Sequence, residues 1–325
     1  MTYTDDDLDR LFRALRPPAR DAHLDARAIA LRESIIRGTR ESSRVRPKRR
    51  VVWAGLTTAA AGVATAVLVA VAVLMPTQTA VALTPPPLEY TFAGNLDEVL
   101  ADAQTDLRAG PDVAQVSAVH SVTWGWNVEM ASAHVEIVPQ DITYVWSADG
   151  GSTSRAVAGE SYWSENERPE GVDPSPYQPG EVLNEVVTPP EEFTLPADAV
   201  TLTGSSTAEI EKALAVFGAT PESSSGDLLA AVTGLLQYWT LDDAQHATLL
   251  RLLEESGDLT VLGETTDRLG RDVIGVQVSQ VIPERRDTFF ISTETGRIVG
   301  IESDLVKHLG DLPLGVILYT MWDAE

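Results

Sequence analysis

The chain has 325 residues, with 24 basic and 48 acidic side chains and no cysteine. The lack of cysteine excludes disulfides, thiolate metal ligands, a thiol nucleophile and the lipid-attachment cysteine of a bacterial lipoprotein. Charge is divided unevenly, since residues 1–50 hold 13 basic and 8 acidic residues, which leaves 11 basic and 40 acidic residues for the rest. The acidic part would repel nucleic acid, so we expect no direct nucleic-acid partner.

The first 50 residues predict two amphipathic helices. Apolar side chains at i, i+3, i+4 and i+7 form the first stripe, which ends before Pro17 and consists of Leu8, Leu11, Phe12 and Leu15. A second stripe follows, made of Leu24, Ala28, Leu31 and Ile35. Two such helices cannot build a core of their own. We expect either that residues 1–46 bind a cytosolic protein through the first stripe, or that the helices lie on the membrane or are partly disordered.

Residues 51–75 form an uncharged stretch of 25 residues, VVWAGLTTAAAGVATAVLVAVAVLM. As a helix it would be about 37 Å long, enough to cross a hydrocarbon core of roughly 30 Å with some tilt. Five basic residues precede it in RVRPKRR (44–50), and no charge follows in residues 76–87. Because such charges stay inside, we predict a single-pass protein of the cell membrane with a cytoplasmic N-terminus and an extracytoplasmic C-terminus.

A signal peptide is the alternative to this anchor. The sequence Ala80-Val81-Ala82 offers a cleavage site after Ala82. However, the apolar stretch is longer than the usual 7–15 residues, and about 50 residues precede it, where a signal peptide has only a short basic segment. The pattern therefore favours an uncleaved anchor.

Beyond the span, we expect a Pro-rich spacer at 76–87 and an α+β domain at 88–325. Residues 88–92 predict a short strand, and residues 116–128 alternate apolar and polar side chains, which predicts a long half-buried strand. Further strands are expected at 133–147 and 154–163, joined by a tight turn at 148–151. The loop at 167–180 is either a surface connection or a lid.

Helices and then strands complete the expected domain. Capping signals predict helices that begin after Asn95, Ser206 and Thr240, with partners at Glu98, Glu209 and Asp243, and a leucine stripe at 228–239 predicts one more. Five strands should follow, near residues 259–264, 273–278, 286–292, 297–302 and 315–322. This order predicts a curved antiparallel sheet with helices on one face.

The sequence lacks a recognisable catalyst. None of the five histidines has the spacing of a metal site, and no nucleophile or phosphate-binding motif is present, so we expect no enzyme activity, cofactor or metal. His120, Trp124 and Trp126 share one side of the predicted strand at 116–128. They are either ordinary core or the wall of an apolar pocket for an acyl chain or an aliphatic peptide.

Three segments carry a family resemblance: VWSADGGSTSR (145–155), GETTDRLGRDVIGVQV (263–278) and STETGRIVGIE (292–302). Together with the short head and the single span, they resemble actinobacterial single-pass membrane proteins encoded near extracytoplasmic-function sigma factors. The resemblance implies an anti-sigma-like role and an outer domain similar to the LolA/LolB and RseB/MucB lipoprotein-carrier fold. Without cysteine, the chain departs from the zinc-binding anti-sigma pattern.

Two functions follow as hypotheses. In the first, the outer domain senses an envelope component, as in envelope stress, and the head restrains a cytosolic partner such as a sigma factor. In the second, the protein is a membrane-anchored carrier for a lipid or lipoprotein and has no signalling role.

Overall fold

The computed structural model describes residues 81–82, 85–110, 113–125, 134–135, 138–147, 149–170, 173–193, 201–307 and 314–323. All of them belong to one compact unit, Gly55–Glu325. The predicted head helices and the predicted span at 51–75 lie outside the described residues. Within the described ranges, no helix is both long and apolar enough to cross a membrane.

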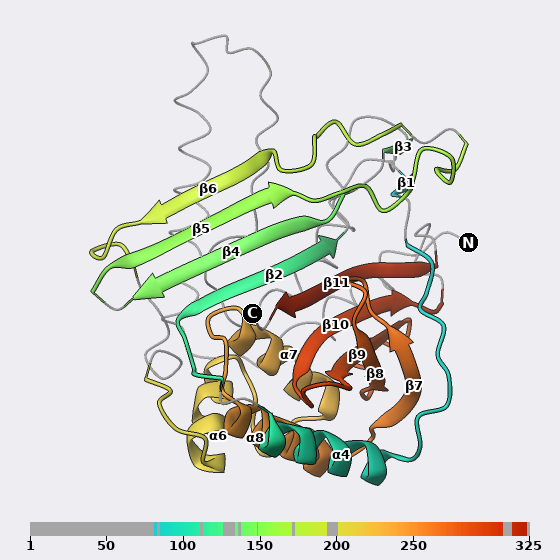
Figure 1. Cartoon of the computed structure of the whole chain (residues 1–325). Coiled ribbons are helices and arrows are strands. Elements are labelled where there is room, and N and C mark those ends of the chain that lie inside the picture. The colour runs from blue at the N-terminus through green and yellow to red at the C-terminus, as the bar shows by residue number, and fades with distance from the viewer. Residues whose placement is uncertain are drawn as a thin grey trace, which may run out of the picture. The chain divides into compact units, whose positions relative to one another are not determined.

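An antiparallel sheet of nine strands organises the described part of the chain, in the order β6-β5-β4-β2-β11-β10-β9-β8-β7 (Figure 1). The strands are β2 (Ala118–Gly125), β4 (Gln140–Ser147), β5 (Gly151–Ala158), β6 (Val182–Thr188), β7 (Thr260–Thr266), β8 (Asp272–Gln277), β9 (Arg285–Ser292), β10 (Ile298–Leu305) and β11 (Gly315–Asp323). A separate parallel pair joins β1 (Val81–Ala82) to β3 (His134–Val135). The sheet confirms the predicted α+β class and antiparallel pairing.

The described helices gather on one face of this sheet (Figure 1). They are α4 (Leu96–Ala109), α6 (Thr207–Val216), α7 (Ser225–Leu236) and α8 (Asp243–Ser256). Asn95 and Ser206 begin α4 and α6 with capping boxes, as predicted, because their side chains accept from the third backbone N–H and Glu98 and Glu209 reach back.

The predicted cap of α8 was wrong by two residues. Asp242 caps this helix, with Gln245 completing the capping box. Thr240 instead exchanges backbone hydrogen bonds with Val116 and donates its hydroxyl to the Ala118 carbonyl at 2.7 Å. Its hydroxyl therefore ties the chain before α8 to the start of β2 and is not available as a cap.

Strand alternation divides the apolar side chains between the two faces of the sheet. On the helix face, Phe289 packs with Leu235, Leu249 and Leu250, and all four are 0 % exposed. The other face carries a second cluster, made of Trp124, Val273, Phe290, Val299, Val316, Tyr319 and Met321. A sheet with apolar side chains on both faces needs a cover on each, and here the helices cover one face.

The stem, defined as residues 85–91, lies on the second face, which we call the stem face. Leu88 and Tyr90 pack against its cluster. The expected strand at 88–92 is reduced to one isolated bridge, between Thr91 and Glu264. The stem can approach this closely because a Cβ at Gly263 would lie 1.8 Å from the Thr91 carbonyl oxygen. Thus the end of the expected Pro-rich spacer contacts the domain, since the Pro86 carbonyl accepts from Arg268.

Strand β6 was not predicted from the sequence, because its apolar and polar residues do not alternate cleanly. Its residues are all exposed or intermediate, and Val187 is 67 % exposed. In contrast, the predicted turn before Gly151 is confirmed, with Ser147 paired to Gly151 across β4 and β5. The described strands thus grade from fully buried β10 to the poorly covered edge strand β6.

Two glycines in turns with positive φ provide a matched test of close packing. Gly296 has φ of +71°, and a Cβ there would lie 2.1 Å from the Ala103 carbonyl oxygen in α4. Gly270 has φ of +81° and no atom within 4 Å of its Cβ position. We predict that Gly270→Ala costs about 1–3 kcal/mol through backbone strain alone. Gly296→Ala should lower the free energy of unfolding by more, because α4 must also move.

Urea unfolding, followed by tryptophan fluorescence, measures the loss in free energy of unfolding for each variant. Equal losses would contradict the contact between α4 and the turn that joins β9 and β10.

Candidate functional site

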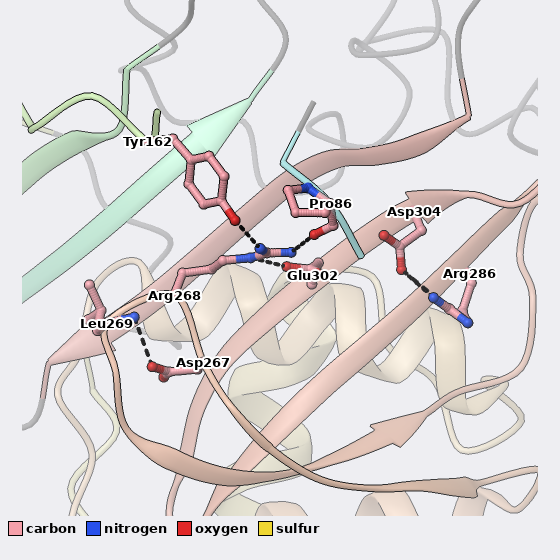
Figure 2. A network of polar contacts seen from close by, with 8 residues as sticks. All are labelled: Pro86, Tyr162, Asp267, Arg268, Leu269, Arg286, Glu302 and Asp304. Carbon is pink, nitrogen blue, oxygen red and sulfur yellow. Dashed lines mark hydrogen bonds and ion pairs between the residues drawn. The ribbon is translucent and has the colours of Figure 1, made fainter. Parts of the chain in front are cut away.

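A buried ion pair lies on the stem face, between Arg268 and Glu302 (Figure 2). The Arg268 Nε atom donates to Glu302 Oε2 at 2.8 Å, and the two side chains are only 4 % and 2 % exposed. Glu302 is on β10, opposite Tyr319 of β11. The Arg268 guanidinium also lies 5.8 Å from the centre of the Tyr319 ring. A charged pair is therefore embedded beside the second apolar cluster.

The turn between β7 and β8 positions Arg268. Asp267 Oδ1 accepts the backbone N–H groups of Leu269 and Arg271, and Asp267 Oδ2 accepts from the Arg271 side chain. Arg271 in turn donates to the carbonyls of Val299 on β10 and Trp322 on β11. These bonds fix the turn to the sheet, so Arg268 extends from a rigid support (Figure 2).

Arg268 joins three segments that are far apart in the sequence. Besides Glu302, its Nη2 donates to the Pro86 carbonyl of the stem at 2.9 Å. Its Nη1 donates to the Tyr162 hydroxyl at 3.4 Å, and Tyr162 belongs to the connection between β5 and β6. We call Arg268, Glu302, Pro86 and Tyr162 the stem junction. A single guanidinium therefore ties the three segments to one another.

A second ion pair lies beside the junction. Arg286 on β9 donates to Asp304 Oδ2 at 2.9 Å, and Asp304 stands two residues after Glu302 on β10 (Figure 2). Among the described residues, Asp304 Oδ1 and Thr288 Oγ1 are buried without a hydrogen-bond partner. Each such atom costs about 1–3 kcal/mol of desolvation, so this face of the sheet holds polar groups that packing alone does not satisfy.

Burial sets the protonation of the junction. It raises the pKa of Glu302 from 4.5 to about 7, because desolvation outweighs the hydrogen bond and the charge of Arg268. For Arg268, burial lowers the pKa, but the hydrogen bond and charge of Glu302 raise it above its ordinary value. Arg268 thus stays charged while Glu302 changes its charge near neutral pH.

The junction is suited to holding segments together, because its charged side chains are occupied by one another and by the stem. Glu302 can gain or lose a proton near neutral pH, but its side chain is only 2 % exposed. Over the described ranges, no group of three His, Asp or Glu residues could hold a metal ion.

The predicted pocket residues are separated or only partly described. Trp124 is 1 % exposed and stacks on Tyr319 with 6.1 Å between ring centres, inside the second cluster. His120 is half-buried, and its Nε2 lies 2.9 Å from Asp141 Oδ1. Trp126 and the head residues Leu8, Leu11, Phe12 and Leu15 lie outside the described residues. Trp124 is therefore packed as core, and the three-residue pocket remains a prediction.

A small cavity lies beside a second histidine, His246. The His246 Nδ1 atom accepts the Ile298 backbone N–H at 3.2 Å, and burial together with the charge of Arg297 holds the pKa of His246 well below its usual value. Arg297 donates to Asp243 and to the Leu241 carbonyl. The cavity leaves about 20 Å³ for the centre of a water-sized sphere, which is room for about one water. It is too small for an acyl chain.

Sequence reasoning missed the stem junction. Arg268 and Glu302 lie in segments quoted for the family resemblance, but there they read as turn and strand residues. One signal in the sequence could have indicated the junction. Glu302 is an acidic residue at the end of the predicted strand RIVGIE (297–302), where buried positions favour apolar side chains. The partner from the β7–β8 turn became visible only in the folded chain.

Compared with known proteins, the sequence matches no family model and no curated protein, and the fold matches no solved structure.

The raised pKa of Glu302 predicts a pH-dependent stability. Between the unfolded pKa of 4.5 and the folded pKa of about 7, the folded state binds a proton that the unfolded state has released. The contribution of protonated Glu302 to the free energy of unfolding is therefore fully present below about pH 4.5. This contribution, on the order of 3 kcal/mol, is lost as the pH rises through about 7. Glu302→Gln should remove this slope. Urea unfolding across that interval measures the difference between the two proteins, and a constant difference would show that Glu302 titrates normally.

Trp124 provides a test of core against pocket. Because Trp124 is a fully packed aromatic residue stacked on Tyr319, Trp124→Ala should lower the free energy of unfolding by about 3–5 kcal/mol. The half-buried Trp163 is the matched control and should cost clearly less. A small loss for Trp124→Ala, together with reduced lipid co-purification, would instead favour the predicted apolar pocket.

Proposed function

We propose that the chain is a single-pass membrane regulator. Its outer domain senses an envelope component, and its head, residues 1–46, binds a cytosolic partner such as a sigma factor. The charge difference across residues 51–75 supports the orientation, with the head inside the cell and the C-terminus outside.

The observation that carries this proposal is the attachment of the stem to the domain. Only nine residues separate Met75, at the end of the apolar stretch, from Pro85 at the start of the stem. Arg268 holds the Pro86 carbonyl, and Thr91 bridges to Glu264 on β7. A flexible spacer would isolate the span from the domain, whereas a docked stem transmits a change in the domain toward the span.

A carrier without a signalling role is less well supported. Such a protein needs a hollow apolar pocket, usually of about 300–1,000 Å³. Among the described residues the cavity near His246 is far smaller, and Trp124 is packed against Tyr319. The expected similarity to the LolA/LolB and RseB/MucB fold therefore enters the proposal as architecture, with helices on one face of a curved sheet, and not as lipid transport.

A split-reporter assay tests the head. Residues 1–46, fused to one half of the reporter, are paired in turn with each sigma factor of the source organism. We expect one pair to give a signal, and Leu11→Asp with Phe12→Asp to abolish it, since truncating or charging a buried anchor commonly costs about 2 kcal/mol or more.

Asp9→Asn with Arg13→Gln is the matched control, because both positions lie outside the apolar stripe. If no pair gives a signal and the Leu11/Phe12 variant only detaches the head from anionic vesicles, the head is a membrane-surface element and the regulatory proposal is wrong.

The stem junction is tested by replacing the ion pair with apolar residues. Arg268→Met with Glu302→Leu removes the hold on Pro86 while keeping side-chain volume, and such replacements of buried pairs are often neutral for stability. Hydrogen exchange at residues 88–91, the stem residues that carry a backbone N–H, should rise in the variant, and the transcription restrained by the head should change. Faster exchange with unchanged transcription would contradict transmission through the stem.

A further inference from the structure

The two edges of the sheet are covered differently. At β7, the Thr91 N–H donates to the Glu264 carbonyl at 2.9 Å and the Glu264 N–H donates back at 2.8 Å, so the stem covers part of that edge. β6 ends the sheet on the other side, and none of the residues that the structure describes pairs with its outer edge. Relative to the described part of the chain, this edge of seven residues is unpaired, and an unpaired edge offers N–H and C=O groups to another strand.

Side chains along this edge suit an added strand. Val182 is 44 % exposed and Val187 is 67 % exposed. Val187 lies opposite Thr153 on β5, which lies opposite Val145 on β4, and Val145 is 47 % exposed. Because directly opposite residues share a face, Val145, Thr153 and Val187 form a row of β-branched side chains that continues to the edge of the sheet. A new strand would extend this row.

The surroundings of β6 define the charge of the partner. Residues 159–170 and 173–193 contain nine acidic residues and one basic residue, Arg168, and Arg155 on β5 is a second basic neighbour because it lies opposite Glu185 of β6. The acidic residues are Glu160, Glu165, Glu167, Glu170, Asp173, Glu181, Glu185, Glu191 and Glu192. A field of this sign attracts cationic segments and repels acidic peptides and anionic lipid.

We propose that the outer edge of β6 binds an extended peptide segment rich in lysine or arginine, which adds to the sheet as a tenth strand. This inference deepens the proposed function by naming the class of component that the outer domain senses, and it rests on that function for the sensing role alone. The connection that leads into β6 carries Tyr162, which contacts Arg268, and Arg268 holds Pro86.

The binding test uses the full chain in a mild detergent and a fluorescein-labelled peptide of four Lys-Val repeats. Fluorescence anisotropy should show saturable binding that weakens as salt is added. The same peptide with every backbone nitrogen methylated keeps its charge and length but cannot donate hydrogen bonds. It should bind at least about tenfold more weakly, because main-chain hydrogen bonds supply much of the affinity in strand addition.

Hydrogen exchange locates the bound peptide. Residues 182–188 should become protected on binding, while residues 260–266 at the opposite edge should not change. Equal affinity for the two peptides would show a purely electrostatic contact and would overturn the proposal. No binding, or protection at β7 in place of β6, would overturn it as well.

Two sets of charge-neutral variants separate local from overall charge. The affinity for the Lys-Val peptide should fall by about tenfold when Glu185→Gln, Glu191→Gln and Glu192→Gln are combined. The control set, Glu211→Gln, Glu222→Gln and Glu254→Gln, changes the same net charge among exposed residues near the helices and should have less than about a twofold effect. Equal effects of the two sets would contradict a site at β6.

The site and the regulatory role can fail separately. Peptide binding at β6 that leaves transcription unchanged supports the strand-addition site and contradicts the sensing role.

Discussion

The buried pair of Arg268 and Glu302 is the interaction on which the stem face depends. An ion pair in an apolar environment costs desolvation energy that the mutual attraction of the charges only partly returns. This pair is retained beside Trp124 and Tyr319, although apolar residues would pack there more simply. What it provides is a hydrogen-bond donor for the Pro86 carbonyl and for the Tyr162 hydroxyl. It therefore contributes to the placement of segments more than to stability.

This arrangement explains why the sheet is apolar on both faces. The helices cover one face through side chains such as Leu235 and Phe289. The other face is covered in part by the stem, which contributes Leu88 and Tyr90 to the second cluster. Covering a sheet with the segment that leads to the predicted span makes the packing of the domain depend on the position of that segment. A regulator needs such a dependence, whereas a carrier needs an empty space.

Protonation and strand addition would act on the same junction from different sides. Glu302 changes charge near neutral pH, which alters how strongly Arg268 is held. The connection before β6 presents Tyr162 to the same guanidinium. Both influences converge on the hydrogen bond from Arg268 to the Pro86 carbonyl, which joins the junction to the stem. In the proposed mechanism, the stem would respond through rearrangement of one side chain.

Local patterns in the sequence determined most of the element types in the described domain, with β6 and the expected strand at 88–92 as exceptions. The capping pairs at Asn95 and Ser206 and the turn before Gly151 were predictable because each depends on residues close together in the chain. The cap of α8 was misplaced because Thr240 is used by β2, a contact 122 residues away. Likewise, the sequence could not predict which face of the sheet the stem covers, because Gly263 and Thr91, which approach closely there, are far apart in sequence.

The uneven charge and the uncharged stretch at 51–75 are properties of the sequence alone, and they define the expected membrane topology. The stem junction is a property of the tertiary structure. A buried charge is stable only where its partner meets it, and Arg268 meets Glu302 across 34 residues and Pro86 across 182. No local pattern encodes such a meeting, because strand order and the close approach of backbones at glycines decide it.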